Sequence, residues 1–82
     1  MVISDFFSTE YPDKRSLQIL LNRIEEVEDK KEEYFESGNV FDLTINFKQS
    51  KVYIEENLFE ETTEILNLTL DEFYQEIFKM IS

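Results

Sequence analysis

The segment from residue 40 to residue 56, VFDLTINFKQSKVYIEE, constrains the fold more than any other part of the chain. Apolar and polar residues alternate along its two halves, and this period of two is typical of strands with one buried face. The two halves are separated by a short polar stretch, which predicts a β-hairpin. Its apolar face would consist of Phe41, Leu43, Ile45, Phe47, Val52 and Ile54.

The same alternation predicts the register of the hairpin. If Gln49-Ser50 is a two-residue loop, Phe47 pairs with Val52 and every apolar residue lies on one face. A slip of one residue would turn the apolar side chains of one strand to water. Gln-Ser is an unfavourable pair for the tight turns of two-residue hairpins. A four-residue loop over residues 48–51 is the alternative and keeps the same side chains on the same face.

Length and composition bound the class of protein. Eighty-two residues predict one domain over residues 1–82, and 41% hydrophobic with 15% aromatic residues is too apolar for a disordered chain. The absence of Cys and His excludes disulfides, thiolate zinc sites and the commonest general base. The single Gly excludes a glycine-rich phosphate loop. We therefore expect no cofactor, no metal, no small-molecule substrate and no enzymatic activity.

The charge of the chain is strongly acidic, with 19 acidic against 8 basic residues and a net charge of −11. Direct nucleic-acid binding is disfavoured, because phosphate contacts need clustered Lys and Arg. No apolar run approaches the roughly 20 residues of a membrane span, and the first residues do not resemble a signal peptide. We expect a cytoplasmic protein without membrane contact, whose acidity serves either solubility or a basic partner.

Residues from about Asp13 to Glu36 predict a long amphipathic helix. Pro12 suits a first turn, Asp13 or Ser16 can act as the cap, and Gly38 suits the C-terminal end. The buried stripe has spacings of three and four and would consist of Leu17, Leu20, Leu21, Ile24, Val27, Tyr34 and Phe35.

One flank of this helix is unusually acidic. Like charges four residues apart destabilise a helix, and acids near its C-terminus oppose the macrodipole. Such a conflict with local rules indicates either a binding site or an ordinary solvated face. This first acidic patch consists of Glu25, Asp29, Glu32, Glu33 and Glu36.

After the hairpin the chain predicts one more strand and a second helix. The stretch from Thr62 to Leu68 alternates only in part, with Leu66 and Leu68 facing inward. Thr69 and Glu72 have the spacing of a capping box, which predicts a helix to about Ile81. Its buried face would consist of Leu70, Phe73, Tyr74, Ile77, Phe78 and Ile81. A second acidic patch, Glu55, Glu56, Glu60 and Glu61, lies before the strand.

These elements predict an α+β, two-layer domain of order α-β-β-β-α. A three-stranded antiparallel sheet would carry an N-terminal and a C-terminal helix on one face. Residues 1–11 would form a short helix or a cap that fills the core, with Phe6, Phe7 and Phe59 as the alternative exposed apolar residues. The other face of the sheet would be open and polar, showing Asp42, Thr44, Asn46, Tyr53 and Glu55. This face is either a solvated surface or an interface.

The hairpin FDLTINFKQSKVYIEE, followed by an acidic connection and by ILNLTLDEFYQEI, resembles small bacterial immunity proteins. That family protects cells from polymorphic toxins, including those of contact-dependent growth inhibition. The resemblance covers about residues 12–80 and carries no single functional residue over. It implies a cytoplasmic inhibitor that binds a cognate toxin domain, often a nuclease.

Charge and resemblance together favour an immunity protein that binds a basic toxin domain through acidic patches. Two alternatives stay open: a phage-type acidic mimic of nucleic acid that inhibits a host defence nuclease, and an adaptor whose acidity serves only solubility. The expected toxin-binding residues are Glu25, Asp29, Glu32, Glu33, Glu36, Asp42, Tyr53, Glu55, Glu56, Glu60 and Glu61.

Overall fold

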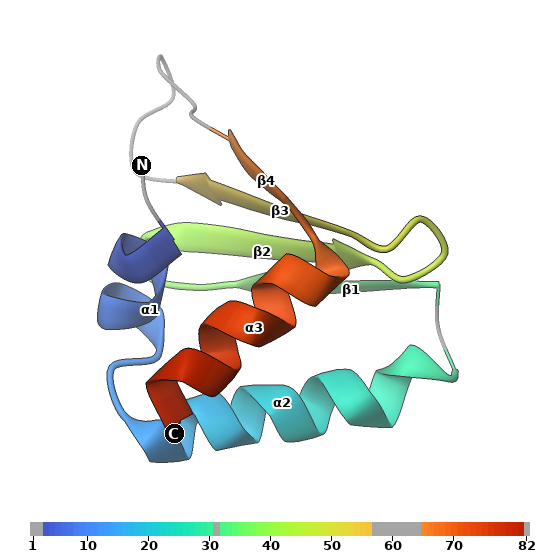
Figure 1. Ribbon diagram of the computed structural model, residues 1–82. Helices are drawn as coiled ribbons and strands as arrows, with labels where there is room; N and C mark the ends of the chain where they lie inside the picture. Colours follow the sequence, from blue (N-terminus) through green and yellow to red (C-terminus); the bar gives the residue numbers. More distant parts are fainter. Residues whose placement is uncertain (1–2, 31, 57–64, 82) are drawn as a thin grey trace.

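A computed structural model describes residues 3–30, 32–56 and 65–81, and shows an α+β fold (Figure 1). The four strands form an antiparallel sheet in the order β1-β2-β3-β4, so that each strand pairs with its neighbour in sequence. The predicted class is confirmed, but the prediction of three strands and one N-terminal helix is wrong. The elements are α1 (Ile3–Glu10), α2 (Lys14–Glu28), β1 (Glu33–Ser37), β2 (Phe41–Asn46), β3 (Lys51–Glu56), β4 (Ile65–Thr69) and α3 (Leu70–Ile81).

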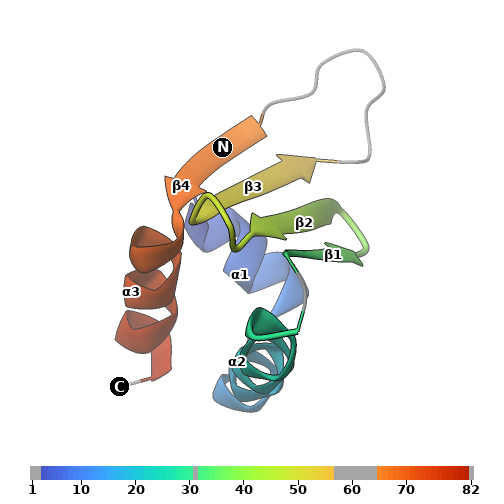
Figure 2. The ribbon, with the colours of Figure 1, turned by 90° about the vertical axis from the view of Figure 1, so that its right-hand side faces the viewer.

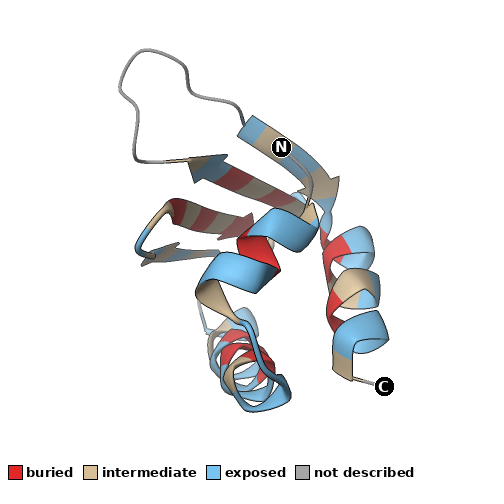
Figure 3. Ribbon diagram, turned by 90° about the vertical axis from the view of Figure 1, so that its left-hand side faces the viewer, coloured by how far each residue is buried: buried red, intermediate tan, exposed pale blue. Residues whose placement is uncertain are grey.

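All three helices lie on one face of the sheet, and Figure 2 shows the strands as the opposite layer. In Figure 3 buried residues alternate with less buried ones along β2 and β3. The core therefore lies between the sheet and the helices. Its buried members are Phe6, Phe7, Leu17, Leu20, Leu21, Ile24, Phe41, Leu43, Ile45, Val52, Ile54, Leu70, Phe73 and Ile77.

The hairpin of β2 and β3 forms as predicted, with its apolar residues on the core face, but its register differs. Val52 pairs with Ile45 rather than with Phe47, and the loop is residues 47–50. Local turn chemistry selects this loop. The Asn46 side chain accepts the Gln49 N–H at 3.0 Å, and Ser50 adopts a left-handed φ of 56°. The shift of two residues preserves the facing of every side chain, which is why the pattern of apolar residues could not detect it.

The predicted helix over residues 13–36 ends eight residues early, at Glu28, and β1 follows. The Lys30 N–H donates to the Val27 carbonyl at 3.0 Å and closes the last turn. In β1 the side chain of Tyr34 packs against the core, whereas Phe35 is 61% exposed. A continuous helix would have stacked several like charges four residues apart, and the strand avoids that repulsion.

Two helix caps form as the sequence predicts. Asp13 and Ser16 make a capping box at the start of α2, with the Ser16 N–H donating to Asp13 Oδ1 at 2.8 Å. Thr69 and Glu72 make a second one, in which the Glu72 N–H donates to Thr69 Oγ1 at 3.1 Å. Because β4 runs directly into α3, this second box fixes the point where strand becomes helix.

Several apolar residues at the two ends of the chain take defined positions. Phe6 and Phe7 of α1 are buried, so the N-terminal segment is a core-filling helix and not an exposed anchor. Phe7 stacks on Phe73 of α3 at a centroid distance of 5.9 Å. Phe78 was predicted to be buried, but it is 55% exposed and stacks on Tyr74. Phe59 lies outside the described residues.

The start of the last strand also falls outside the described part of the chain. The strand was expected from Thr62, and the structure describes β4 from Ile65. Leu66 and Leu68 face the core as predicted, while Ile65 is exposed. None of the helices in the described ranges has the length and apolarity needed to cross a membrane.

Candidate protein-binding face

The face of the sheet opposite the helices, here called the open face, carries three rows of side chains across the four strands. The alternation along each strand and the pairing between strands place these rows. The middle row is Phe35, Thr44, Tyr53 and Asn67. One outer row is Ser37, Asp42, Glu55 and Ile65, and the other is Glu33, Asn46, Lys51 and Thr69.

The middle row combines two aromatic rings with short polar side chains. Phe35 is 61% exposed and Tyr53 is half-buried, with Thr44 between them on β2. A largely exposed Phe on a sheet face contributes little to the core, and burial of its remaining exposed surface by a partner would stabilise a complex by about 1–2 kcal/mol. Aromatic residues surrounded by polar ones are typical of interface centres.

The outer rows make the open face acidic. Within the four described strands, this face carries the carboxylates of Glu33, Asp42 and Glu55 against the single cation of Lys51. The Ser37 hydroxyl donates to Asp42 Oδ1 at 2.8 Å, which orients that carboxylate. The face can therefore attract cationic side chains around a partly apolar centre.

The first acidic patch does not exist as one surface. Glu25 and Asp29 are exposed at the C-terminal end of α2, and Glu32 is exposed in the connection to β1. Glu33 lies on the open face, whereas Glu36 points to the helix side of the sheet. The change from helix to strand separates these residues, because a strand turns successive side chains to opposite faces.

The second acidic patch is divided in the same way. Glu55 is exposed on the open face next to Asp42, as predicted, while Glu56 is half-buried and belongs to the opposite alternation. Glu60 and Glu61 lie outside the described residues. Of the predicted toxin-binding residues, the structure brings together Glu33, Asp42, Tyr53 and Glu55 on one face.

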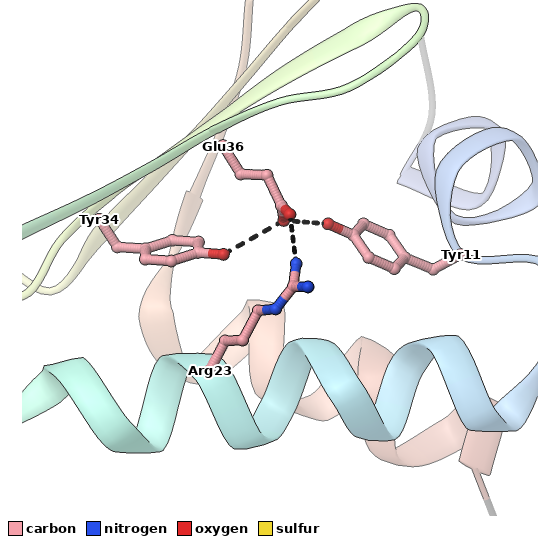
Figure 4. A network of polar contacts seen from close by, with 4 residues as sticks. All are labelled: Tyr11, Arg23, Tyr34 and Glu36. Carbon is pink, nitrogen blue, oxygen red and sulfur yellow. Dashed lines mark hydrogen bonds and ion pairs between the residues drawn. The ribbon is translucent and has the colours of Figure 1, made fainter.

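Glu36 is instead held by three side chains on the helix side of β1 (Figure 4). Arg23 of α2 donates to Oε1 at 2.7 Å, Tyr34 donates to Oε2 at 3.2 Å, and the Tyr11 hydroxyl donates to Oε2 as well. Burial, together with the Glu36 charge and hydrogen bonds, raises the pKa of both tyrosines above its ordinary value. These contacts join three segments of the chain, so Glu36 stabilises the fold and is not free to bind a partner.

Glu10, at the end of α1, was not singled out from the sequence. Its carboxylate accepts the backbone N–H groups of Asn39, Val40 and Phe41 at 2.8–3.0 Å, in the turn between β1 and β2. Burial opposes ionisation, but the three hydrogen bonds outweigh it and lower the pKa of Glu10. Gly38 leaves room for this carboxylate, because a Cβ there would lie 2.5 Å from the Glu10 carboxyl carbon and would push the side chain away from its hydrogen bonds. No local sequence signal indicates this contact between residues about 30 positions apart.

Comparisons of the chain with protein-family models, with curated proteins and with solved structures find no match.

Proposed function

We propose that this protein is an inhibitor that acts by binding, an immunity protein for a basic toxin domain of the nuclease type. The open face carries this proposal, because Phe35 and Tyr53 lie there beside Asp42 and Glu55, on the side of the sheet away from the three described helices. Aromatic rings supply apolar contact area and cation-π sites, and the carboxylates supply charge complementarity. A chain without His and Cys also lacks the usual base and thiolate nucleophile of an enzyme.

The mechanism is steric and electrostatic occlusion. A nuclease presents a cationic cleft to its substrate, and carboxylates on a sheet face can occupy positions that phosphates would take. A net charge of −11 also steers a cationic partner during encounter. Electrostatic steering raises association rate constants to roughly 10⁸–10⁹ M⁻¹s⁻¹ at low salt. Fast capture suits an inhibitor that must act before the toxin does.

A second candidate function, an adaptor that binds through apolar surface, is favoured by the C-terminal part of α3. Phe78 and Met80 are 55% and 37% exposed there, close to the end of the described chain. An adaptor of this kind would form complexes that depend weakly on salt. The acidic mimic of nucleic acid shares the charge argument of the leading proposal and differs from it in its target, a host nuclease.

The test is a binding experiment with the products of the neighbouring genes, made catalytically inactive. We expect a one-to-one complex with a toxin C-terminal domain. The double variant Asp42→Lys/Glu55→Lys should slow association at least tenfold at low salt. Glu26→Lys, an exposed reversal on α2 away from the open face, should change it less than twofold.

Three other outcomes would contradict the proposal. An association rate that changes neither in Asp42→Lys/Glu55→Lys nor with added salt would refute the electrostatic mechanism. If substitution of Phe78 or Met80 abolishes the complex and the charge reversals do not, the protein is an adaptor that binds through apolar surface. Binding to a host defence nuclease and to no neighbouring gene product would establish the mimic.

A further inference from the structure

Among the described residues, β1 is an edge strand of the sheet, and its backbone hydrogen bonds show which of its groups point outward. The Phe47 N–H donates to the Glu32 carbonyl at 2.9 Å, and the Gly38 N–H donates to the Phe41 carbonyl at 2.8 Å. In an antiparallel pair such bonded positions alternate with positions that point away. The N–H and C=O groups of Glu33, Phe35 and Ser37 therefore point away from β2, three donors and three acceptors in all.

The opposite edge strand, β4, also has five described residues, but it offers fewer free backbone groups. The Leu70 N–H donates to the Ser50 carbonyl, which shows which positions of β4 bond to β3. By the same alternation, the backbone N–H and C=O groups of Ile65, Asn67 and Thr69 point away from β3. The Thr69 N–H is already bound by Glu72 Oε1 at 3.0 Å in the capping box. In the described part of the chain, β1 is thus the edge with more groups available to an added strand.

The surroundings of β1 suit an extended, cationic segment. Two hollows lie at its ends, each of about 310–330 Å³. The first is lined by three carboxylates, two lysines and Phe47, and its acidic side chains can face a cationic segment. The second is lined by Tyr11, Glu10, Glu36 and the turn after β1, but both of its carboxylates are already bound within the fold. Along the strand itself, Glu33 and Phe35 present a carboxylate and an exposed ring on the open face.

Charge decides between a second copy of this chain and a different partner. Pairing two copies through β1 would bring together two molecules that each carry a net charge of −11. Such like-charged association is opposed at ordinary ionic strength, whereas a cationic segment is attracted. We infer that the outer edge of β1 docks an extended basic segment of the partner, which adds to the sheet as a fifth strand. The basic character of that partner rests on the function proposed above.

The geometry also specifies the segment. Its residue opposite Phe35 lies on the open face beside an exposed ring, and a β-branched or aromatic side chain fits there. Its residue opposite Glu33, two positions away on the same face, is Lys or Arg. Main-chain bonds to Glu33, Phe35 and Ser37 supply the affinity, as in other strand additions.

The test uses random nine-residue peptides displayed on phage and selected against the whole protein at low salt. Enriched peptides should carry Lys or Arg at alternate positions. On binding, the amides of residues 33, 35 and 37 should gain protection from hydrogen exchange, and residues 34 and 36 should not change. No enrichment, or protection without this alternation, would refute the inference.

A matched pair of variants isolates the backbone donor. Phe35→Pro removes the outward N–H without breaking a bond to β2, and Phe35→Val removes the ring but keeps the N–H. We expect Phe35→Pro to bind the peptides at least tenfold more weakly than Phe35→Val. Equal affinity would overturn the proposal. If Phe35→Pro fails to fold by circular dichroism, Ser37→Pro and Ser37→Ala take its place.

The outcomes separate this inference from the proposed function. A toxin complex that leaves residues 33, 35 and 37 unprotected would refute the strand addition alone. Peptides that dock on β1 without any toxin complex would refute the immunity function alone. Dimers that appear in sedimentation and disappear in Phe35→Pro would show that a second copy occupies the edge.

Discussion

Replacing Glu36 with Gln should destabilise the protein, whereas the same change at Glu33 should not. The two residues lie on one strand, three positions apart, and face opposite sides of the sheet. Each substitution removes one negative charge, so both relieve the general repulsion of an acidic chain equally. The difference between them therefore measures the contacts that Glu36 makes with Arg23, Tyr11 and Tyr34.

The expected magnitude follows from those contacts. The ion pair with Arg23 is open to solvent mainly on the arginine side, with side-chain exposures of 54% for Arg23 and 24% for Glu36, and solvent-screened pairs contribute about 0–1 kcal/mol. The hydrogen bond from Tyr11 lies in a part-buried site, where a bond to a charged group is worth about 1.5 kcal/mol or more. The glutamine oxygen can still accept one bond. We expect Glu36→Gln to lower the free energy of unfolding by about 1–2 kcal/mol, and Glu33→Gln to change it by less than about 0.5 kcal/mol.

Urea unfolding at pH 7, followed by circular dichroism, measures both values. Glu36→Gln should also lower the pKa of Tyr11 and Tyr34, because the Glu36 charge and hydrogen bonds contribute to its rise. The rise in phenolate absorbance would then begin at a lower pH than in the unchanged protein. Equal stabilities for the two variants would refute the reasoning and would return Glu36 to the candidate binding residues.

Three further predictions concern the turns and the last helix. Glu10→Ala should lower the free energy of unfolding by about 2–3 kcal/mol at pH 7 after allowance for solvent screening, because three backbone donors lose their acceptor. Since the pKa of Glu10 is lowered, this difference should shrink as the pH falls below about 4. Urea unfolding of Glu10→Ala and of the control Glu26→Ala measures it. Ser50→Gly should raise stability by about 0.5–1 kcal/mol, because a left-handed φ of 56° is strained for Ser, and a decrease in urea midpoint would contradict this. Burial, with the charges of Glu28 and Glu25, raises the pKa of Tyr74 to about 12. The stability that the neutral Tyr74 phenol contributes should therefore be complete below pH about 10 and lost as the pH rises toward 12. If Tyr74→Phe unfolds at alkaline pH with the same profile as the unchanged protein, Tyr74 makes no such contribution.

Much of the fold could be predicted because its signals are local. The alternation in β2 and β3, the capping boxes at Asp13 and Thr69, and the apolar period of α3 each depend on a few consecutive residues. Such patterns specify which side chains face the core. These patterns could not fix the hairpin register to better than two residues, because a shift of two residues moves no side chain from one face of the sheet to the other.

The first strand was missed because its decisive contacts are distant in sequence. Glu36 faces inward in β1, so a charged residue interrupts the apolar alternation that would have indicated a strand. Its partners, Tyr11 and Arg23, are 25 and 13 residues away. The like charges four residues apart between Glu25 and Glu36 had suggested a functional helix. They were instead a sign that the helix ends early, at Glu28.

The candidate site shows the same division between local and distant information. Asp42, Tyr53 and Glu55 were predicted on the polar side of the hairpin, and they lie on the open face. Phe35 could join them only once β1 had been recognised as a strand. Glu10 carries no local signal, since its role depends on the turn that follows Gly38.

Confining the core to one side of the sheet gives the open face freedom to diverge. Exposed residues such as Phe35 and Glu55 lie on the side away from the helix-covered core, so substitutions there are expected to change stability by about 0.5 kcal/mol or less. A protein near its stability threshold can accept many such changes in succession. A lineage of these proteins could therefore follow a changing partner, residue by residue, while the layer beneath remained the same.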